Sequence, residues 1–299
     1  MESDPLLLGC DFSSSPSPAK PIVVALGRWR PARIGEKNPS SPAENGTLLL
    51  LKLERFSTLE AFAQWLTEER EPWVGAFDFP FGLPRELVEA LGWPTVWAAC
   101  MDHYGAQPRE ALRELFRRFC AARPVGAKFA HRATDRLAGS SSSMKWVNPP
   151  VAWMMHAGVP LLRRAEALMP GLAPGRADRV ALEAYPGMLA RAVLGRRSYK
   201  GDSAAARTPE RLAARQVLVA ALEQGLTQWE IRLRMRPRDR AALLDDARGD
   251  RLDAVLCLAQ AAWAWLQEQR LTGAGRRSGA TPGWGLPSFD PLEGWIVGA

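Results

Sequence analysis

The stretch ARGDRLDAVLCLAQAAWAW, residues 247–265, begins with two aspartates three residues apart and then turns almost wholly apolar. Its pattern predicts a buried helix from about Asp250 to Gln269, docked on its surroundings through one apolar face. Residues at i and i+3 face the same side of a helix, so Asp250 and Asp253 present their carboxylates together. One interpretation is a helix N-cap with a first-turn acid that complements the helix dipole. The other is a pair of functional carboxylates.

Apolar runs bounded by turn residues predict the strands of the fold. They are PLLLGCDF (5–12), PIVVALGRW (21–29), TLLLLKLERF (47–56), PWVGAFDFPFGLP (72–84) and RVALEAYP (179–186). The short spacing of the first three runs favours an antiparallel meander, and the later strand–helix alternation favours parallel neighbours. We therefore expect an α/β fold with a mixed five-stranded sheet and flanking helices. Residues 1–299 form a single domain in this interpretation, with a mainly helical insertion at about residues 85–178.

Acidic residues recur at the ends of these predicted strands. Asp11 follows the first strand, Asp78 lies in the fourth between two phenylalanines, and Glu183 is near the end of the fifth. A carboxylate among apolar residues is costly unless it is paired, hydrogen-bonded or bound to a metal. The alternatives are an Asx-turn for Asp11, a buried salt bridge for Asp78 and an arginine partner for Glu183. Several such carboxylates together favour hard cations such as Mg²⁺ or Mn²⁺.

The overall composition narrows the class of protein. The chain is 47% hydrophobic, which is enough for a sizeable core, and its formal net charge of +7 is weak support for a nucleic-acid partner. The four cysteines form no CxxC pair and the three histidines are isolated, so neither a zinc site nor a disulfide framework is indicated. Without a signal-peptide pattern or an apolar run of about 20 residues, we expect a cytoplasmic protein with no membrane partner.

Three basic residues are candidates for contacting the phosphates of a substrate. Arg132 lies in HRATDR (131–136), Lys145 precedes a tryptophan in a serine-rich stretch, and Lys200 follows two arginines in RRSYKG. A cation beside an aromatic residue can contact a phosphate and stack a base. A solvated basic surface is the alternative interpretation for each.

The motifs GCDF, FDFPFGLP, EAYP, DRLDA and EGWI resemble those of an uncharacterised bacterial family of predicted nucleases with a ribonuclease H-like fold. The resemblance spans most of the chain and is least specific over residues 85–178. It implies that the final helix packs its acidic start against the central strands. Asp11 and Asp78 would then face Asp250 and Asp253 across a metal site, with Asp11, Asp78 and Asp253 as ligands and Glu183 as an auxiliary group. Many nucleases of this superfamily have Glu where this chain has Asp78.

These observations lead to a functional hypothesis and two alternatives. We expect a metal-dependent nuclease that hydrolyses phosphodiester bonds of DNA or RNA with two Mg²⁺ or Mn²⁺ ions. One alternative is a catalytically inactive module that binds nucleic acid or protein. The other is a phosphotransferase of the actin-like superfold, although the loop after Asp11 lacks phosphate-binding glycines and the Gly-rich loop at 273–279 lacks their spacing. The oligomeric state stays open.

Overall fold

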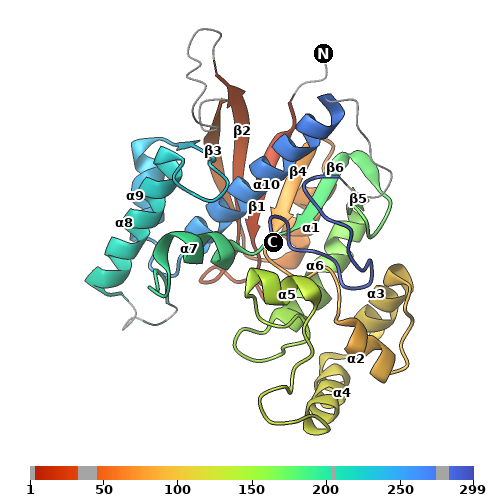
Figure 1. Cartoon of the computed structure of the whole chain (residues 1–299). Helices are drawn as coiled ribbons and strands as arrows, with labels where there is room; N and C mark the ends of the chain where they lie inside the picture. Colours follow the sequence, from red (N-terminus) through yellow and green to blue (C-terminus); the bar gives the residue numbers. More distant parts are fainter. Residues whose placement is uncertain (1–3, 33–45, 202, 204–206, 274–282) are drawn as a thin grey trace.

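The computed structural model describes residues 4–32, 46–201, 203, 207–273 and 283–299. Within them the chain forms an α/β fold around a seven-stranded mixed sheet (Figure 1) with the strand order β5-β6-β4-β1-β2-β3-β7. The strands are β1 (Leu6–Asp11), β2 (Ile22–Pro31), β3 (Gly46–Phe56), β4 (Trp73–Phe77), β5 (Ala167–Leu168), β6 (Arg176–Glu183) and β7 (Leu233–Arg234). Most of the stretch at 31–46 and of the Gly-rich loop at 273–279 lies outside the described residues.

The pairing of the strands follows the expected pattern. β1, β2 and β3 form an antiparallel meander, whereas β4 is parallel to β1 and β6 is parallel to β4. These five strands are the five predicted from the sequence. The prediction of a five-stranded sheet was nevertheless wrong in number, because β5 and β7 each add one short parallel strand at an edge. Strands of two residues are too short to leave a periodic pattern in the sequence.

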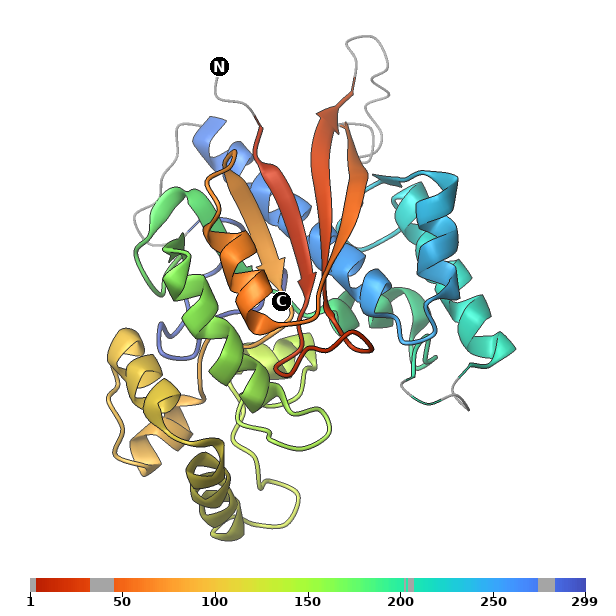
Figure 2. The ribbon, with the colours of Figure 1, turned by 180° about the vertical axis from the view of Figure 1, so that it is seen from behind.

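Helices cover both faces of the sheet. They are α1 (Leu59–Thr67), α2 (Arg85–Ala90), α3 (Trp97–Ala106), α4 (Arg109–Ala121), α5 (Ala133–Ala138), α6 (Val151–Arg164), α7 (Pro186–Leu194), α8 (Pro209–Gln224), α9 (Pro237–Asp245) and α10 (Asp250–Gly273). α10 crosses one face, and α1 and α6 lie on the other (Figures 1 and 2). The predicted insertion corresponds to α2–α6 between β4 and β6. No helix in the described part of the chain has the length and hydropathy needed to cross a membrane.

Side-chain alternation along β1 separates the two cores of the molecule. Leu6, Leu8 and Cys10 belong to the core under α1 and α6, whereas Leu7 belongs to the core under α10. Successive side chains of a strand point to opposite faces, so Asp11 continues on the face that packs against α10. The same counting along β4 places Asp78 on this face, in phase with Val74 and Ala76.

The helix predicted from the opening stretch begins at Asp250 as expected and extends four residues beyond the predicted end, to Gly273. Its backbone lies directly against β1, because Gly9 has no side chain. A Cβ at Gly9 would overlap the amide nitrogen of Leu258 and the carbonyl oxygen of Ala254. The predicted docking of its apolar residues on the sheet is confirmed, and the burial extends beyond that one face. α10 is buried nearly all round, since α7, α9 and the C-terminal segment cover its outer side.

The replacement Gly9→Ala should therefore lower the free energy of unfolding by about 3 kcal/mol, because the new methyl group meets backbone atoms that cannot move independently. Gly105→Ala is the matched control, since the space around Gly105 on α3 is open and alanine is the better helix former. Urea unfolding of both variants measures the difference. Equal stability of the two variants would contradict the close contact between β1 and α10.

Candidate active site

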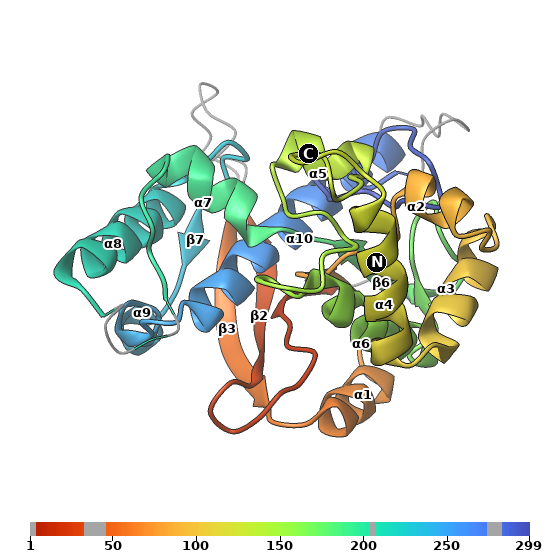
Figure 3. The ribbon, with the colours of Figure 1, turned by 90° about the horizontal axis from the view of Figure 1, so that it is seen from below.

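Two of the predicted acids lie side by side at the ends of adjacent strands. Cys10 of β1 pairs with Phe77 of β4 in parallel register, and the amide of Asp78 donates a hydrogen bond to the carbonyl oxygen of Cys10 (2.9 Å). The ladder thus continues one residue beyond β4 and holds Asp78 next to Asp11. Figure 3 looks onto this edge of the sheet, with α7–α9 on one side and α2–α5 on the other.

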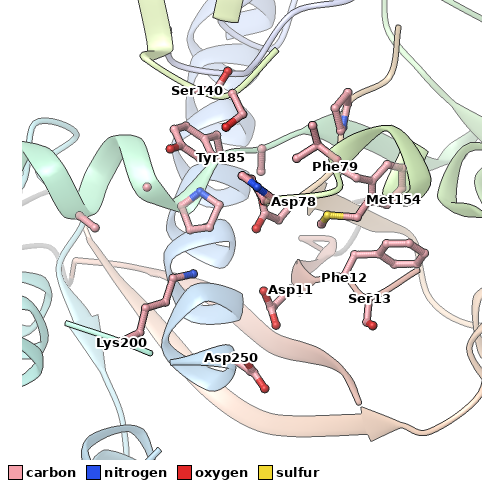
Figure 4. A pocket seen from close by; sticks show the side chains of 18 of the residues that line it. Asp11, Phe12, Ser13, Asp78, Phe79, Ser140, Met154, Tyr185, Lys200 and Asp250 are labelled. Atoms are coloured by element: carbon pink, nitrogen blue, oxygen red, sulfur yellow. The ribbon is translucent and has the colours of Figure 1, made fainter. Parts of the chain in front are cut away.

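The first turn of α10 brings two further carboxylates to the same edge. Asp253 is 1% exposed and accepts hydrogen bonds from the Tyr199 hydroxyl and the Lys200 ammonium, one on each carboxylate oxygen. Asp250 lies one turn earlier and is half-buried. Figure 4 shows Asp11, Asp78 and Asp250 around one cavity, with the Lys200 side chain pointing into it. The structure therefore brings together four of the five acids that the sequence singled out.

Mutual repulsion and burial disturb the ionisation of these acids. Burial and the charge of Asp253 raise the pKa of Asp78 to about 7, against the opposing effect of Lys200. The same causes raise the pKa of Asp11 well above its usual value. Burial, Asp246 and Asp253 raise the pKa of Asp250 to about 6. Lys200 lowers the pKa of all three acids, and Lys20 also lowers that of Asp250, but burial and mutual repulsion outweigh both cations. The cluster therefore keeps protons at a pH where isolated aspartates have lost them.

Three of these carboxylates have no hydrogen-bond donor. Within the described residues, nothing donates a hydrogen bond to the side-chain oxygens of Asp11, Asp78 or Asp250. A half-buried carboxylate without a donor is unusual, since desolvation is normally offset by pairing. As the side chains stand, no group of three or more His, Cys, Asp or Glu in the described part of the chain is arranged to hold a metal ion. The carboxylates of Asp11, Asp78 and Asp250 repel one another, which keeps their oxygens apart. Both oxygens of Asp253 already accept hydrogen bonds, from Tyr199 and Lys200.

Glu183 lies near this cluster, where it lines the cavity and contributes to the raised pKa of Asp78, but its carboxylate is oriented differently. It pairs with Phe77 in the sheet register and therefore points to the face opposite Asp78. There its carboxylate accepts hydrogen bonds from the amide of Phe81 (2.9 Å) and from the guanidinium of Arg132 (2.6 and 2.8 Å). Arg132 is 1% exposed and also binds Asp135 (2.8 Å). This buried ion pair gives both side chains a structural role. Both also line the cavity, so the substrate role of Arg132 and the auxiliary role of Glu183 stay predictions.

The two predicted lysines differ in their position. Lys200 lies at the cavity, with its side chain 44% exposed, so its ammonium contacts both Asp253 and solvent. Lys145 is half-buried in the turn before α6, where its amide donates to the carbonyl oxygen of Ser142 (3.0 Å), and it is not among the residues that line the cavity. The structure therefore supports a role at the site for Lys200 and gives none for Lys145.

The cavity has a volume of about 580 Å³, and its two walls differ in chemical character. The acids and Lys200 form one wall, and Phe12, Phe79 and Met154 form the other (Figure 4). The sequence analysis missed Tyr199 and Met154. Tyr199 adjoins Lys200 in the chain, so the SYK tripeptide was an available signal. Met154 lies on α6 in the insertion, and nothing in the local sequence connects it with the acids.

Replacing Asp78 with Asn should stabilise the protein at alkaline pH. The folded chain keeps a proton on Asp78 up to about pH 7, whereas the unfolded chain loses it near the usual value of 3.8. Stability is therefore fully present below about pH 4 and falls as the pH rises toward 7. Asn cannot ionise, so the gain should be on the order of 2 kcal/mol at pH 8 and should shrink at pH 5.

Thermal unfolding in EDTA at pH 5 and pH 8 measures this difference. Asp102→Asn is the control, because Asp102 is an exposed aspartate on α3 outside the cluster. A gain that is equal at the two pH values would contradict the raised pKa of Asp78.

The replacement Arg132→Met should destabilise the fold by about 3–5 kcal/mol, because it leaves Glu183 and Asp135 buried without their counter-ion. Arg117→Met should have almost no effect, since Arg117 and its partner are exposed. Adding Glu183→Gln to Arg132→Met should recover part of the loss. Urea unfolding of the three variants is the measurement, and an Arg132→Met protein as stable as the control would refute the structural role.

Comparison with known proteins places the chain in a family. A family model described as "Protein of unknown function (DUF429)" matches residues 24–276, which include Asp78, Lys200 and the start of α10. Asp11 lies outside the matched residues. No curated protein and no solved structure matches the chain significantly. Since the match covers most of the sequence, the chain belongs to the DUF429 family.

Proposed function

We propose that the protein is a metal-dependent phosphodiesterase that acts on nucleic acid. The observation that carries this proposal is a group of three carboxylates, Asp11, Asp78 and Asp250. They line one cavity with the Lys200 side chain, and no residue in the described part of the chain donates a hydrogen bond to them. Their raised pKa values reflect the high cost of ionising several buried carboxylates side by side, a cost that a bound cation would offset. Such clusters are typical of functional sites.

The arrangement of the elements supports a ribonuclease H-like fold. The first three strands form a meander, the following strands are parallel to β1, and the final helix α10 packs its acidic start against the central strands. This is the arrangement that the resemblance of the motifs implies. The insertion α2–α6 and the edge strands β5 and β7 are additions to that frame.

The donor set suits a hard divalent cation. Carboxylate oxygens are the ligands that Mg²⁺ and Mn²⁺ prefer. Asp11, Asp78 and Asp250 would hold such an ion if their side chains turned toward one another, since they are not arranged around a common point as they stand. A second ion at Asp253 would require Lys200 to leave that carboxylate. A bound divalent ion would lower the pKa of a water molecule and stabilise the leaving oxygen of a phosphodiester.

The residues of the chain itself supply binding and orientation. Asp253 and Tyr199 hold Lys200 with its ammonium at the cavity, where it can bind the non-bridging oxygens of a phosphate. Arg197 and Arg248 also line the cavity and add positive charge beside the acids. Glu183 takes no part in this proposal, because Arg132 neutralises it on the other face of the sheet.

Manganese binding and nuclease activity test the proposal together. The wild-type chain should bind Mn²⁺ in isothermal titration and cleave a mixture of DNA and RNA substrates in its presence. Asp11→Asn and Asp78→Asn should each lower the cleavage rate on the order of 100-fold or more while the fold persists. Asp102→Asn, an exposed aspartate outside the site, is the control and should keep full activity.

Full activity of the Asp78→Asn variant would refute the assignment of the site. A wild-type chain that binds nucleic acid, but does not bind Mn²⁺ and does not cleave, would instead favour a binding module without catalysis.

A further inference from the structure

The wall of the cavity opposite the acids is apolar for a reason that lies in the strands. Phe12 follows Asp11 and Phe79 follows Asp78, so the alternation that sends the acids toward α10 sends both rings toward α6. The two rings pack against each other with their centroids 4.7 Å apart. Each strand end therefore supplies a carboxylate to one side of the cavity and an aromatic ring to the other.

The exposed part of this apolar wall comes from the insertion. Phe12 and Phe79 are only 5% and 2% exposed and form the floor of the wall. Met154 and Val151 of α6 are half-buried and present their side chains to the cavity. Met154 has an unbranched, flexible side chain that adapts to flat ligands. The insertion thus completes a pocket that the strands alone would leave open.

Polar groups border this apolar wall. Ser13, Ser140 and Tyr185 line the same cavity (Figure 4). The hydroxyls of Ser13 and Tyr185 can donate to or accept from a ligand, whereas that of Ser140 donates to Asp135 (3.1 Å) and can still accept. A volume of about 580 Å³ lies in the usual range for sites that bind one small organic ligand. The cavity therefore has the size and the chemistry for a flat heterocycle with polar edges next to a phosphate.

We infer that the apolar wall, formed by Phe12, Phe79 and Met154, binds the base of an unpaired nucleotide whose phosphate lies at the acids and Lys200. This inference rests on the proposed function and names the substrate class of the same site. In a duplex each base is stacked and paired, so it enters such a pocket only after it has been unpaired, at a cost of a few kcal/mol. The substrate is accordingly a single strand or an unpaired end, and a continuous duplex is disfavoured.

The test measures binding separately from cleavage. The full-length Asp78→Asn chain is titrated, with fluorescence anisotropy, against one labelled oligonucleotide as a single strand and as a blunt duplex. The single strand should bind about 10-fold more tightly or better, because a base contact of this kind contributes about 1–3 kcal/mol. Adding Met154→Trp should fill the pocket and weaken binding of the single strand about 10-fold, with little effect on the duplex.

Val147→Trp is the matched control, because Val147 lies in the segment just before α6, is 49% exposed and does not line the cavity. It should leave both affinities unchanged. Thermal unfolding checks that each variant is folded. If Met154→Trp does not fold, the relative affinity of the Asp78→Asn chain for the single strand and the duplex still tests the base pocket.

Equal binding of the two forms, or a folded Met154→Trp chain with unchanged affinity, would overturn the base pocket. Either result would leave the phosphodiesterase proposal standing if the wild-type chain binds Mn²⁺ and cleaves nucleic acid. Binding of neither form, together with no cleavage by the wild type, would overturn both.

Discussion

The contact between the backbones of β1 and α10 is the constraint on which the site depends. Gly9 lets Ala254 and Leu258 of the helix lie against the strand with no side chain between them. Because this close contact is possible only where the strand has a glycine, it fixes the position of α10 along β1. Its first turn consequently lies beside the ends of β1 and β4, where Asp11 and Asp78 are held by the continuing ladder. Residues far apart in the sequence thus meet through apolar packing of α10 and the backbone ladder between β1 and β4.

The electrostatics of the site work against the fold that creates it. Burial places like charges in surroundings that solvate them poorly, and the ammonium groups of Lys200 and Lys20 offset only part of their repulsion. Asp253 accepts hydrogen bonds from the Lys200 ammonium and from the Tyr199 hydroxyl, whereas the other three acids have no such donor among the residues that the structure describes. The surrounding apolar core provides the stability that this arrangement removes. A local loss of folding stability that the rest of the fold compensates is typical of binding and catalytic sites.

Alternation along the strands sorts the acids of the chain into two systems. The side chains of Asp11 and Asp78 fall on the face of the sheet that packs against α10, and within the described ranges no donor reaches their carboxylates. Glu183 falls on the other face and meets the buried guanidinium of Arg132, which also ties the strand to the insertion. Counting residues along β6 would have separated Glu183 from the cluster, since Val180 and Leu182 face α10 while Ala181 faces α6. The arginine partner itself lies 51 residues away, and no local pattern indicates it.

The sequence by itself determined the five central strands, the start of α10 at Asp250 and the acids that meet there, because hydrophobic periodicity and the position of a charge within an apolar run are local properties. The tertiary structure alone decided the edge strands β5 and β7, the burial of α10 on all sides, the pairing of Lys200 with Asp253 and the contribution of Met154 to the cavity. These features depend on which segments pack together across long separations, and packing energy is a property of the pair of surfaces rather than of either segment.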